Sequence, residues 1–168
     1  MRDIIELVIG DITTQEVDAL ISPANNESLL NTDMASHIAV KAGKELSEAC
    51  NRIGKVALGE AVVTPGGKLL AKHVIHAACL TYSQSMTEEN LVLATRAALQ
   101  RARELGLKTL AMPPLDDTGK GFPLKRCAEL MISEVIRHSE KEVTLERVVF
   151  VLPDARVRRI FDECLRQT

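Results

Sequence analysis

Short runs of aliphatic and β-branched residues recur along the chain and predict the strands of a sheet. Several runs are apolar almost throughout, a pattern typical of strands that are covered on both faces. Their spacing predicts a mostly parallel or mixed sheet of about six strands. The runs cover residues 4–9, 19–22, 61–64, 73–78, 109–112 and 147–152.

Helical patterns with recognisable ends separate these runs. Thr87 suits the N-cap of one helix, and Gly106 suits the position just after its last turn. Pro123 suits the first turn of the next helix, and Asp154 the N-cap of the final one. Strands that alternate with helices predict an α/β fold, here a three-layer α/β/α sandwich. Two shorter helices are expected over residues 34–41 and 44–52.

Length and composition narrow the classes of protein. A chain of 168 residues fits a single domain over residues 1–168, and its 46% hydrophobic and 26% charged content is ordinary for a globular protein. A net charge of −2 and an aromatic content of 2% argue against nucleic-acid binding, which uses basic surfaces and stacking platforms. No apolar run approaches the ~20 residues of a membrane span, which argues against a membrane protein.

The four cysteines lie far apart and form no Cys-x-x-Cys pair, so the spacing indicates neither a metal site nor a redox motif. Cys79 ends an apolar strand, while Cys127 and Cys164 fall on apolar helix faces, which favours buried thiols. Reduced thiols and a start without a signal-peptide pattern together predict a cytoplasmic location.

Polar segments follow several strands, where sheets of this class bind ligands. Residues 10–13, Gly-Asp-Ile-Thr, either aim the Asp11 carboxylate into a crevice or form a tight turn. Residues 22–26 end in two asparagines, and the donor and acceptor of Asn25 suit sugar hydroxyls as well as a turn. Residues 112–123 join a strand to a helix and resemble an anion-binding loop.

Taken in order with residues 58–65 and 71–78, these segments resemble the macro domain family, whose members bind ADP-ribose and related NAD metabolites. The resemblance extends from Gly10 to the final helix and is closest to small stand-alone prokaryotic macro proteins. Residues 23–43 are also similar to the macro domain of a histone variant. The resemblance implies ADP-ribose or a derivative as the ligand, and we assign no cofactor and no metal.

The resemblance implies roles at matching positions. Asp11 would accept a hydrogen bond from the adenine amino group, with the Ile12 backbone beside it, and Asn25 would hold the distal ribose. The aromatic residue that often stacks on adenine is replaced by Pro153. The adenosine and distal-ribose ends of the expected site are therefore largely retained.

The first phosphate segment departs from the family. A run of glycines followed by valine is replaced by Asn-Thr-Asp-Met at residues 31–34, so side chains are expected to narrow or fill the cleft. Asp33 and Met34 thereby become candidate ligand contacts. Ala35 stands where hydrolytic members often carry an aspartate, and its methyl group cannot act as an acid or base. His37 lies near the expected cleft and is a further candidate contact.

The second phosphate loop also departs from the family pattern. Two aspartates at residues 116 and 117 stand where amides and hydroxyls usually meet phosphate oxygens. Two unit charges ~5 Å apart repel by about 3 kcal/mol at the effective dielectric of a partly buried site, so weak or moderate binding is expected. Lys120 offsets part of this repulsion if it turns inward. The candidate contacts in this loop are Asp117, Thr118, Gly119, Lys120, Gly121 and Phe122.

Three interpretations follow. The first is a module that binds ADP-ribose or a related NAD metabolite, with no catalytic residue assigned. The second is an ADP-ribosyl ester hydrolase, in which Asn25 orients the sugar and the substrate assists its own hydrolysis. The third is a diverged fold that has lost ADP-ribose and serves in assembly, for example as a homodimer. A Mg²⁺ ion held by Asp33, Asp116 and Asp117 is an alternative account of the altered loops.

Overall fold

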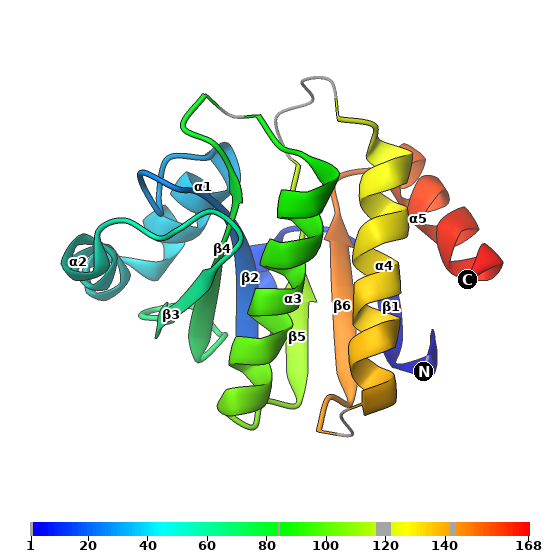
Figure 1. Ribbon diagram of the computed structural model, residues 1–168. Coiled ribbons are helices and arrows are strands. Elements are labelled where there is room, and N and C mark those ends of the chain that lie inside the picture. Colours follow the sequence, from blue (N-terminus) through cyan, green and yellow to red (C-terminus); the bar gives the residue numbers. More distant parts are fainter. Residues whose placement is uncertain (1, 84, 117–121, 142–143) are drawn as a thin grey trace.

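The computed structural model describes residues 2–83, 85–116, 122–141 and 144–168. The described residues form a six-stranded sheet in the order β1-β6-β5-β2-β4-β3. Helices α3, α4 and α5 cover one face of the sheet, and α1 and α2 cover the other (Figure 1). The strands are β1 (Ile5–Ile9), β2 (Ala19–Asn25), β3 (Ala61–Pro65), β4 (His73–Leu80), β5 (Thr109–Met112) and β6 (Arg147–Leu152). The helices are α1 (Asp33–Ala42), α2 (Lys44–Ile53), α3 (Glu88–Glu104), α4 (Leu124–Lys141) and α5 (Ala155–Gln167), with short 3-10 helices η1 (Arg2–Ile4) and η2 (Ile12–Thr14).

The predicted three-layer α/β/α sandwich with a mixed sheet is confirmed. In the order of the sheet, β1, β6, β5, β2 and β4 all run parallel to their neighbours. Strand β3, at the edge, is antiparallel to β4. The expected start of the first strand was wrong by one residue, because Ile4 closes η1 and the strand begins at Ile5. None of the described helices is long and apolar enough to cross a membrane.

Strand β2 runs further than its apolar pattern indicates. It continues through Pro23 to Asn25, although proline cannot donate to a ladder. Within the described residues β2 pairs with β5 at Ala19 and Leu20, and beyond that point it continues beside β4. The Pro23 carbonyl accepts a hydrogen bond from Thr32 Oγ1 at 2.9 Å. Pro23 lies beside Ala77 of β4 and beyond the stretch that pairs with β5, so its missing N–H takes no bond from the β2–β5 ladder.

The predicted caps of α3 and α5 are confirmed, whereas Pro123 lies just before α4, and α1 and α2 extend one residue beyond the expected ranges at three of their four ends. The Thr87 side chain accepts from the Asn90 N–H at 3.1 Å, and the Asp154 side chain accepts from the Val157 N–H at 2.9 Å. Gly106 follows α3 with φ of 66°, a left-handed conformation that glycine adopts without strain. Thr87 and Asp154 therefore fix where α3 and α5 begin, and Gly106 fixes where α3 ends.

A buried histidine makes the fold sensitive to acid. His76 is fully buried on β4, where its Nε2 lies 2.9 Å from Thr64 Oγ1 and 3.8 Å from the Cys50 thiol. Burial lowers the pKa of His76 from 6.5 to about 4. The unfolded chain takes up a proton near pH 6.5, whereas the folded protein does so only near pH 4. Stability is therefore complete above pH 7 and falls as the pH is lowered towards 4.

We expect the free energy of unfolding to fall by about 3 kcal/mol between pH 7 and pH 4 because of His76 alone. Urea denaturation across this range measures the change. His76→Gln should flatten the dependence, whereas His73→Gln, at the partly exposed start of the same strand, should leave it intact. Equal pH dependence in wild type and His76→Gln would contradict the assignment.

Candidate ligand-binding crevice

A cavity of about 520 Å³ opens at the carboxyl ends of β1, β5 and β6, a volume that suits a small organic ligand. Ile12, Met34, Phe122 and Pro153 line it, four positions that the sequence assigned to the ligand. They come from four separate segments: the turn after β1, the start of α1, the segment before α4 and the turn after β6. The fold therefore gathers residues that are distant in sequence around one hollow.

Asp11 lies in the turn after β1 and is held by three hydrogen bonds on one oxygen. Its Oδ1 accepts from the Thr13 N–H at 2.9 Å and from the Thr13 hydroxyl at 2.7 Å, and lies 2.9 Å from His37 Nε2. The turn and the ligand interpretations of this segment are thus compatible, since Asp11 caps η2 while its carboxylate stays 40% exposed. Asp11 lines a neighbouring hollow of about 260 Å³ that also contacts Lys41 and Lys68.

The environment of Asp11 keeps its carboxylate ionised. Burial is the largest single influence and acts to raise the pKa, but hydrogen bonds from His37 and Thr13 and the charge of His37 outweigh it and lower the pKa to about 2. An ionised carboxylate accepts hydrogen bonds and donates none, so it selects a donor such as an amino group.

Asn25 is fully buried at the end of β2. Its Oδ1 accepts from the N–H groups of Glu27 and Ser28 at 2.9 and 2.7 Å, which fixes the orientation of the side-chain amide. Its Nδ2 has no hydrogen-bond partner among the described residues. A buried donor without a partner is costly, which makes this group a candidate to bind a ligand oxygen.

Residues 31–34, which replace the family's glycines, were expected to narrow or fill the cleft, but most of their side chains lie outside the cavity lining. Thr32 is buried, and its hydroxyl donates to the Pro23 carbonyl and accepts from the Ala35 N–H at 3.0 Å, so it caps α1 and faces the fold. Asp33 is exposed at the first position of α1 and is not among the residues that line the cavity. Met34 is the one residue of this segment that lines the cavity, whose volume is about 520 Å³.

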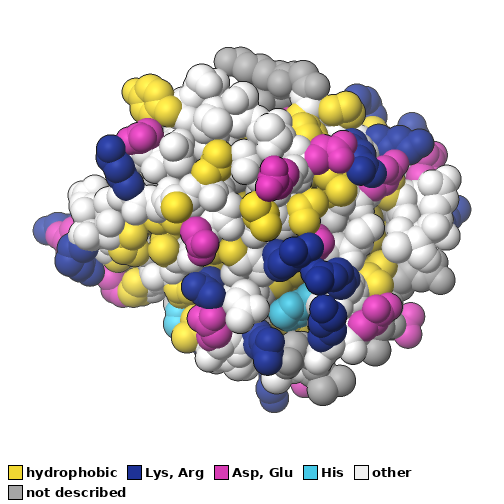
Figure 2. Space-filling model, viewed as in Figure 1, with side chains coloured by type: hydrophobic (Ala, Val, Ile, Leu, Met, Phe, Trp, Pro, Cys, Tyr) yellow, Lys and Arg dark blue, Asp and Glu magenta, His cyan; other side chains and the backbone are white. Residues whose placement is uncertain are grey.

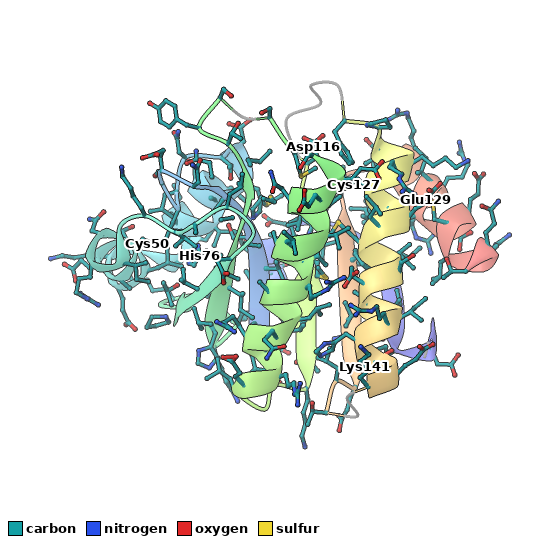
Figure 3. The ribbon with its side chains drawn as sticks, in the orientation of Figure 1. Cys50, His76, Asp116, Cys127, Glu129 and Lys141 are labelled. Carbon is teal, nitrogen blue, oxygen red and sulfur yellow. The ribbon has the colours of Figure 1, made fainter. Side chains whose placement is uncertain are left out.

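The second phosphate loop is described only at its ends. The candidates Asp117, Thr118, Gly119, Lys120 and Gly121 lie outside the described residues. Asp116 and Phe122, which flank them, both line the cavity, and Asp116 lies beyond the carboxyl end of β5 (Figure 3). One of the two aspartates in this loop therefore faces the crevice.

The first turn of α5, which follows β6, adds to the cavity lining a residue that sequence reasoning missed. Arg156, in the first turn of α5, lines the cavity with Val157. A charged residue in an amphipathic helix ordinarily points to solvent, so sequence reasoning assigned Arg156 no role. Because it follows the carboxyl end of β6 by only four residues, its position after a strand was the signal that could have identified it.

The described residues offer neither a metal site nor an activated thiol. They contain no group of three or more His, Cys, Asp or Glu side chains placed to hold a metal ion, although Asp117 of the proposed Mg²⁺ set falls outside them. Burial raises the pKa of both Cys50 and Cys127 to about 11, so both remain neutral thiols near pH 7.

Comparisons with known proteins agree with this geometry. The model of the macro domain family matches residues 21–131. A protein of Mycobacterium tuberculosis is 34% identical over 162 residues, which cover 96% of this chain and 45% of that protein. The chain therefore spans less than half the length of this relative. An O-acetyl-ADP-ribose deacetylase of an Enterobacter species is 34% identical over 173 residues, covering 99% of this chain and 96% of that protein.

Two solved structures are similar to this chain over nearly its whole length. The Oceanobacillus iheyensis macrodomain with ADP is similar with a TM-score of 0.86 and 26% identity, covering 97% of this chain and 90% of that chain. A mutant of the same macrodomain with ADPR has a TM-score of 0.86 and 28% identity, covering 97% and 92%. Both similarities extend over nearly the whole chain described here.

Proposed function

This chain belongs to the macro domain family, and on that basis we propose that it is a module that binds ADP-ribose or a closely related NAD metabolite. The observation that carries the proposal is the cavity of about 520 Å³ lined by Ile12, Met34, Phe122 and Pro153. These four residues stand at positions that the family uses for its ligand. Relatives of 26% and 28% identity whose structures contain ADP and ADPR support it.

The adenine would be held at the end formed by Asp11 and Ile12. Among the described residues, all hydrogen bonds to the Asp11 carboxylate are accepted by Oδ1. Oδ2 can therefore accept a hydrogen bond from a ligand. The exocyclic amino group of adenine is such a donor, whereas the carbonyl of hypoxanthine or guanine would face a like partial charge. This geometry supports adenine over the other purines.

The diphosphate would lie at the start of α1, between Met34 and Asp116. The first N–H groups of a helix and its dipole favour an anion. Asp116 opposes it, while Arg156 across the same cavity supplies a positive charge that the sequence did not assign to the site. These opposed charges support moderate affinity.

The distal ribose would be held by Asn25, whose buried Nδ2 would donate to a ribose oxygen. Such a bond gives the side-chain amide the partner that the described residues do not provide. Since Asn25 ends β2, beyond the stretch of β2 that pairs with β5, the ligand would extend from the end of β1 across the sheet to the end of β2.

Hydrolysis of an ADP-ribosyl ester is a second candidate, favoured by the Enterobacter relative named O-acetyl-ADP-ribose deacetylase. Ala35 opposes the route that uses an aspartate at this position, because the residue is fully buried and carries only a methyl group. Turnover would instead depend on the substrate and on Asn25. Single-turnover assays with O-acetyl-ADP-ribose test it, and activity that survives Asn25→Ala would exclude this mechanism.

Isothermal titration calorimetry with ADP-ribose tests the leading proposal. We expect a measurable heat of binding, with a Kd for ADP-ribose in the micromolar to sub-millimolar range. IDP-ribose, in which hypoxanthine replaces adenine, should bind more weakly. Absence of binding to folded protein at millimolar ligand would reject the proposal. The folded state can be checked in the same sample by circular dichroism.

Pro153→Tyr is expected to tighten ADP-ribose binding. Pro153 is exposed at the edge of the cavity, where an aromatic ring could stack on adenine, and such stacking contributes about 1 kcal/mol, or roughly fivefold in Kd. Calorimetry of wild type and variant measures the change. Pro153→Ala provides the control without a ring, and equal affinities for Tyr and Ala would place the adenine elsewhere.

The proposal also includes a cytoplasmic location, supported by the four cysteines, all free and buried. A homodimer remains a proposal that sizing in solution tests. We propose neither a membrane nor a nucleic acid as the partner of the crevice.

A further inference from the structure

A hollow of about 260 Å³, which we call the α1 hollow, lies beside the crevice. Three segments line it: the turn after β1, Lys41 near the C-terminal end of α1, and residues 68–70 between β3 and β4. Met34, His37 and Lys41 are three and four residues apart, a spacing that places them on one side of α1. Met34 lines the crevice and His37 contacts Asp11, so the same side of α1 reaches the α1 hollow at Lys41.

A tight turn holds Lys68 against the end of α1. The Lys68 N–H donates to the Ala42 carbonyl at 2.9 Å, one of the last carbonyls of the helix. Gly67, with φ of 60°, permits this approach, because a Cβ atom there would lie 2.5 Å from the same carbonyl oxygen. The stem of Lys68 passes Gly43, where a Cβ atom would lie 3.5 Å from its Cδ. The backbone that carries Lys68 is therefore fixed to α1 before any partner binds.

The α1 hollow carries positive charge that the protein does not neutralise. In the part of the chain that the structure describes, neither Lys41 nor Lys68 forms an ion pair or a side-chain hydrogen bond. The Asp11 carboxylate also lines the hollow, but it is already bound by Thr13 and lies 2.9 Å from His37. Over α3 and α4, by contrast, acidic side chains lie among the basic ones and pair with them (Figure 2).

Exposed apolar side chains accompany these charges. Leu70, which lines the hollow, is 57% exposed, and Val40, next to Lys41, is 78% exposed. A partner that covers Leu70 would gain from removing this apolar surface from water. Asp11 disfavours a compact polyanion, because its charge has the same sign and lies in the same hollow. The lining therefore matches an extended ligand that carries both carboxylates and apolar side chains.

We infer that the α1 hollow is a docking site for an acidic peptide segment of a partner protein. Carboxylates of the segment bind Lys41 and Lys68, and one of its apolar side chains packs on Leu70. Exposed ion pairs contribute little to affinity one by one, so the apolar contact supplies much of it, and the two charges select the partner and speed its approach. The site does not depend on ADP-ribose, since these three residues are not among those that line the crevice.

Fluorescence anisotropy of a short fluorescein-labelled peptide of glutamate, leucine and glycine tests the site. We expect Lys41→Gln with Lys68→Gln to bind it at least about tenfold more weakly than wild type, and Leu70→Ser about threefold or more. The control Lys55→Gln with Lys108→Gln makes the same change in net charge as the first variant at exposed positions elsewhere, and should bind like wild type.

Two comparison peptides test the chemistry of the partner. A peptide with serine in place of leucine should bind more weakly, and one with lysine in place of glutamate should not bind. No binding of the first probe to wild type, equal loss in both charge variants, or equal affinity for the leucine and serine peptides would overturn the inference. Displacement of the probe by an equimolar amount of inorganic pyrophosphate would replace the peptide by a phosphate-class ligand.

The same titration in saturating ADP-ribose separates the α1 hollow from the crevice. The peptide should bind within about threefold of its affinity without ADP-ribose, because the residues that hold it lie outside the crevice lining. Complete displacement by ADP-ribose would place the peptide in the crevice and overturn the inference. A protein that binds the peptide and not ADP-ribose would reject the proposed function alone.

Discussion

Asn25→Asp is expected to abolish ADP-ribose binding while the protein stays folded. The substitution keeps an oxygen that accepts from the N–H groups of Glu27 and Ser28, so the turn after β2 is preserved. It replaces the buried Nδ2 donor by a second oxygen, which would repel both the ribose oxygen and the diphosphate. We expect Kd to rise by at least about a hundredfold, since losing a donor and adding a charge act together.

Asn25→Ala provides the contrast. It leaves the N–H groups of Glu27 and Ser28 without their side-chain acceptor and should lower the free energy of unfolding by about 1–3 kcal/mol. Urea denaturation measures the stability of both variants, and calorimetry measures the affinity of those that fold. Wild-type affinity in a folded Asn25→Asp protein would remove Asn25 from the site.

Asp11→Ala is expected to weaken ADP-ribose binding by about ten- to a hundredfold, the free energy of a hydrogen bond to a charged group. The variant also leaves the Thr13 N–H without its cap, so the turn that carries Ile12 becomes less rigid. His37→Ala is the matched control because it removes the third hydrogen bond to Oδ1 and leaves the carboxylate. It should change the affinity by less than about threefold.

The low pKa of Asp11 has a consequence for pH. A carboxylate with a pKa of about 2 is ionised throughout the neutral and mildly acidic range, so its contribution is complete above pH 4 and is lost only as the pH falls through 2. ADP-ribose affinity should therefore show no fall through this group between pH 8 and pH 5. A fall centred between pH 5 and pH 6 that persists in His37→Ala would contradict the assignment.

The fold could be predicted because its signals are local. Apolar runs marked the strands, and Thr87, Gly106 and Asp154 marked helix ends whose caps the structure contains. The direction of β3 had no such signal, since an edge strand is read in the same way whether it runs parallel or antiparallel. The length of β2 was missed because a proline usually marks the end of a strand. Pro23 is tolerated within β2 because the pairing with β5, which lies far away in sequence, has already ended at Leu20.

The candidate site, taken as the lining of the cavity, was predictable to the extent that its residues follow strands. Ile12, Met34, Phe122 and Pro153 could be assigned from motif order, and the structure brings them together. The inward turn of Thr32 could not, because it depends on a hydrogen bond to a carbonyl nine residues away. Nor could the pairing of His37 with Asp11, which joins two elements that only the tertiary fold brings into contact.

Beyond Leu20 the described residues of β2 and β5 form no further ladder, so the upper part of the sheet is divided into two halves. Asp11, Ile12 and Pro153 stand on one half and Asn25 on the other. A ligand that contacts both halves would link them across this gap. The relative motion of the two halves and the affinity for the ligand are then coupled. A substitution deep in either half can therefore weaken binding without contacting the ligand.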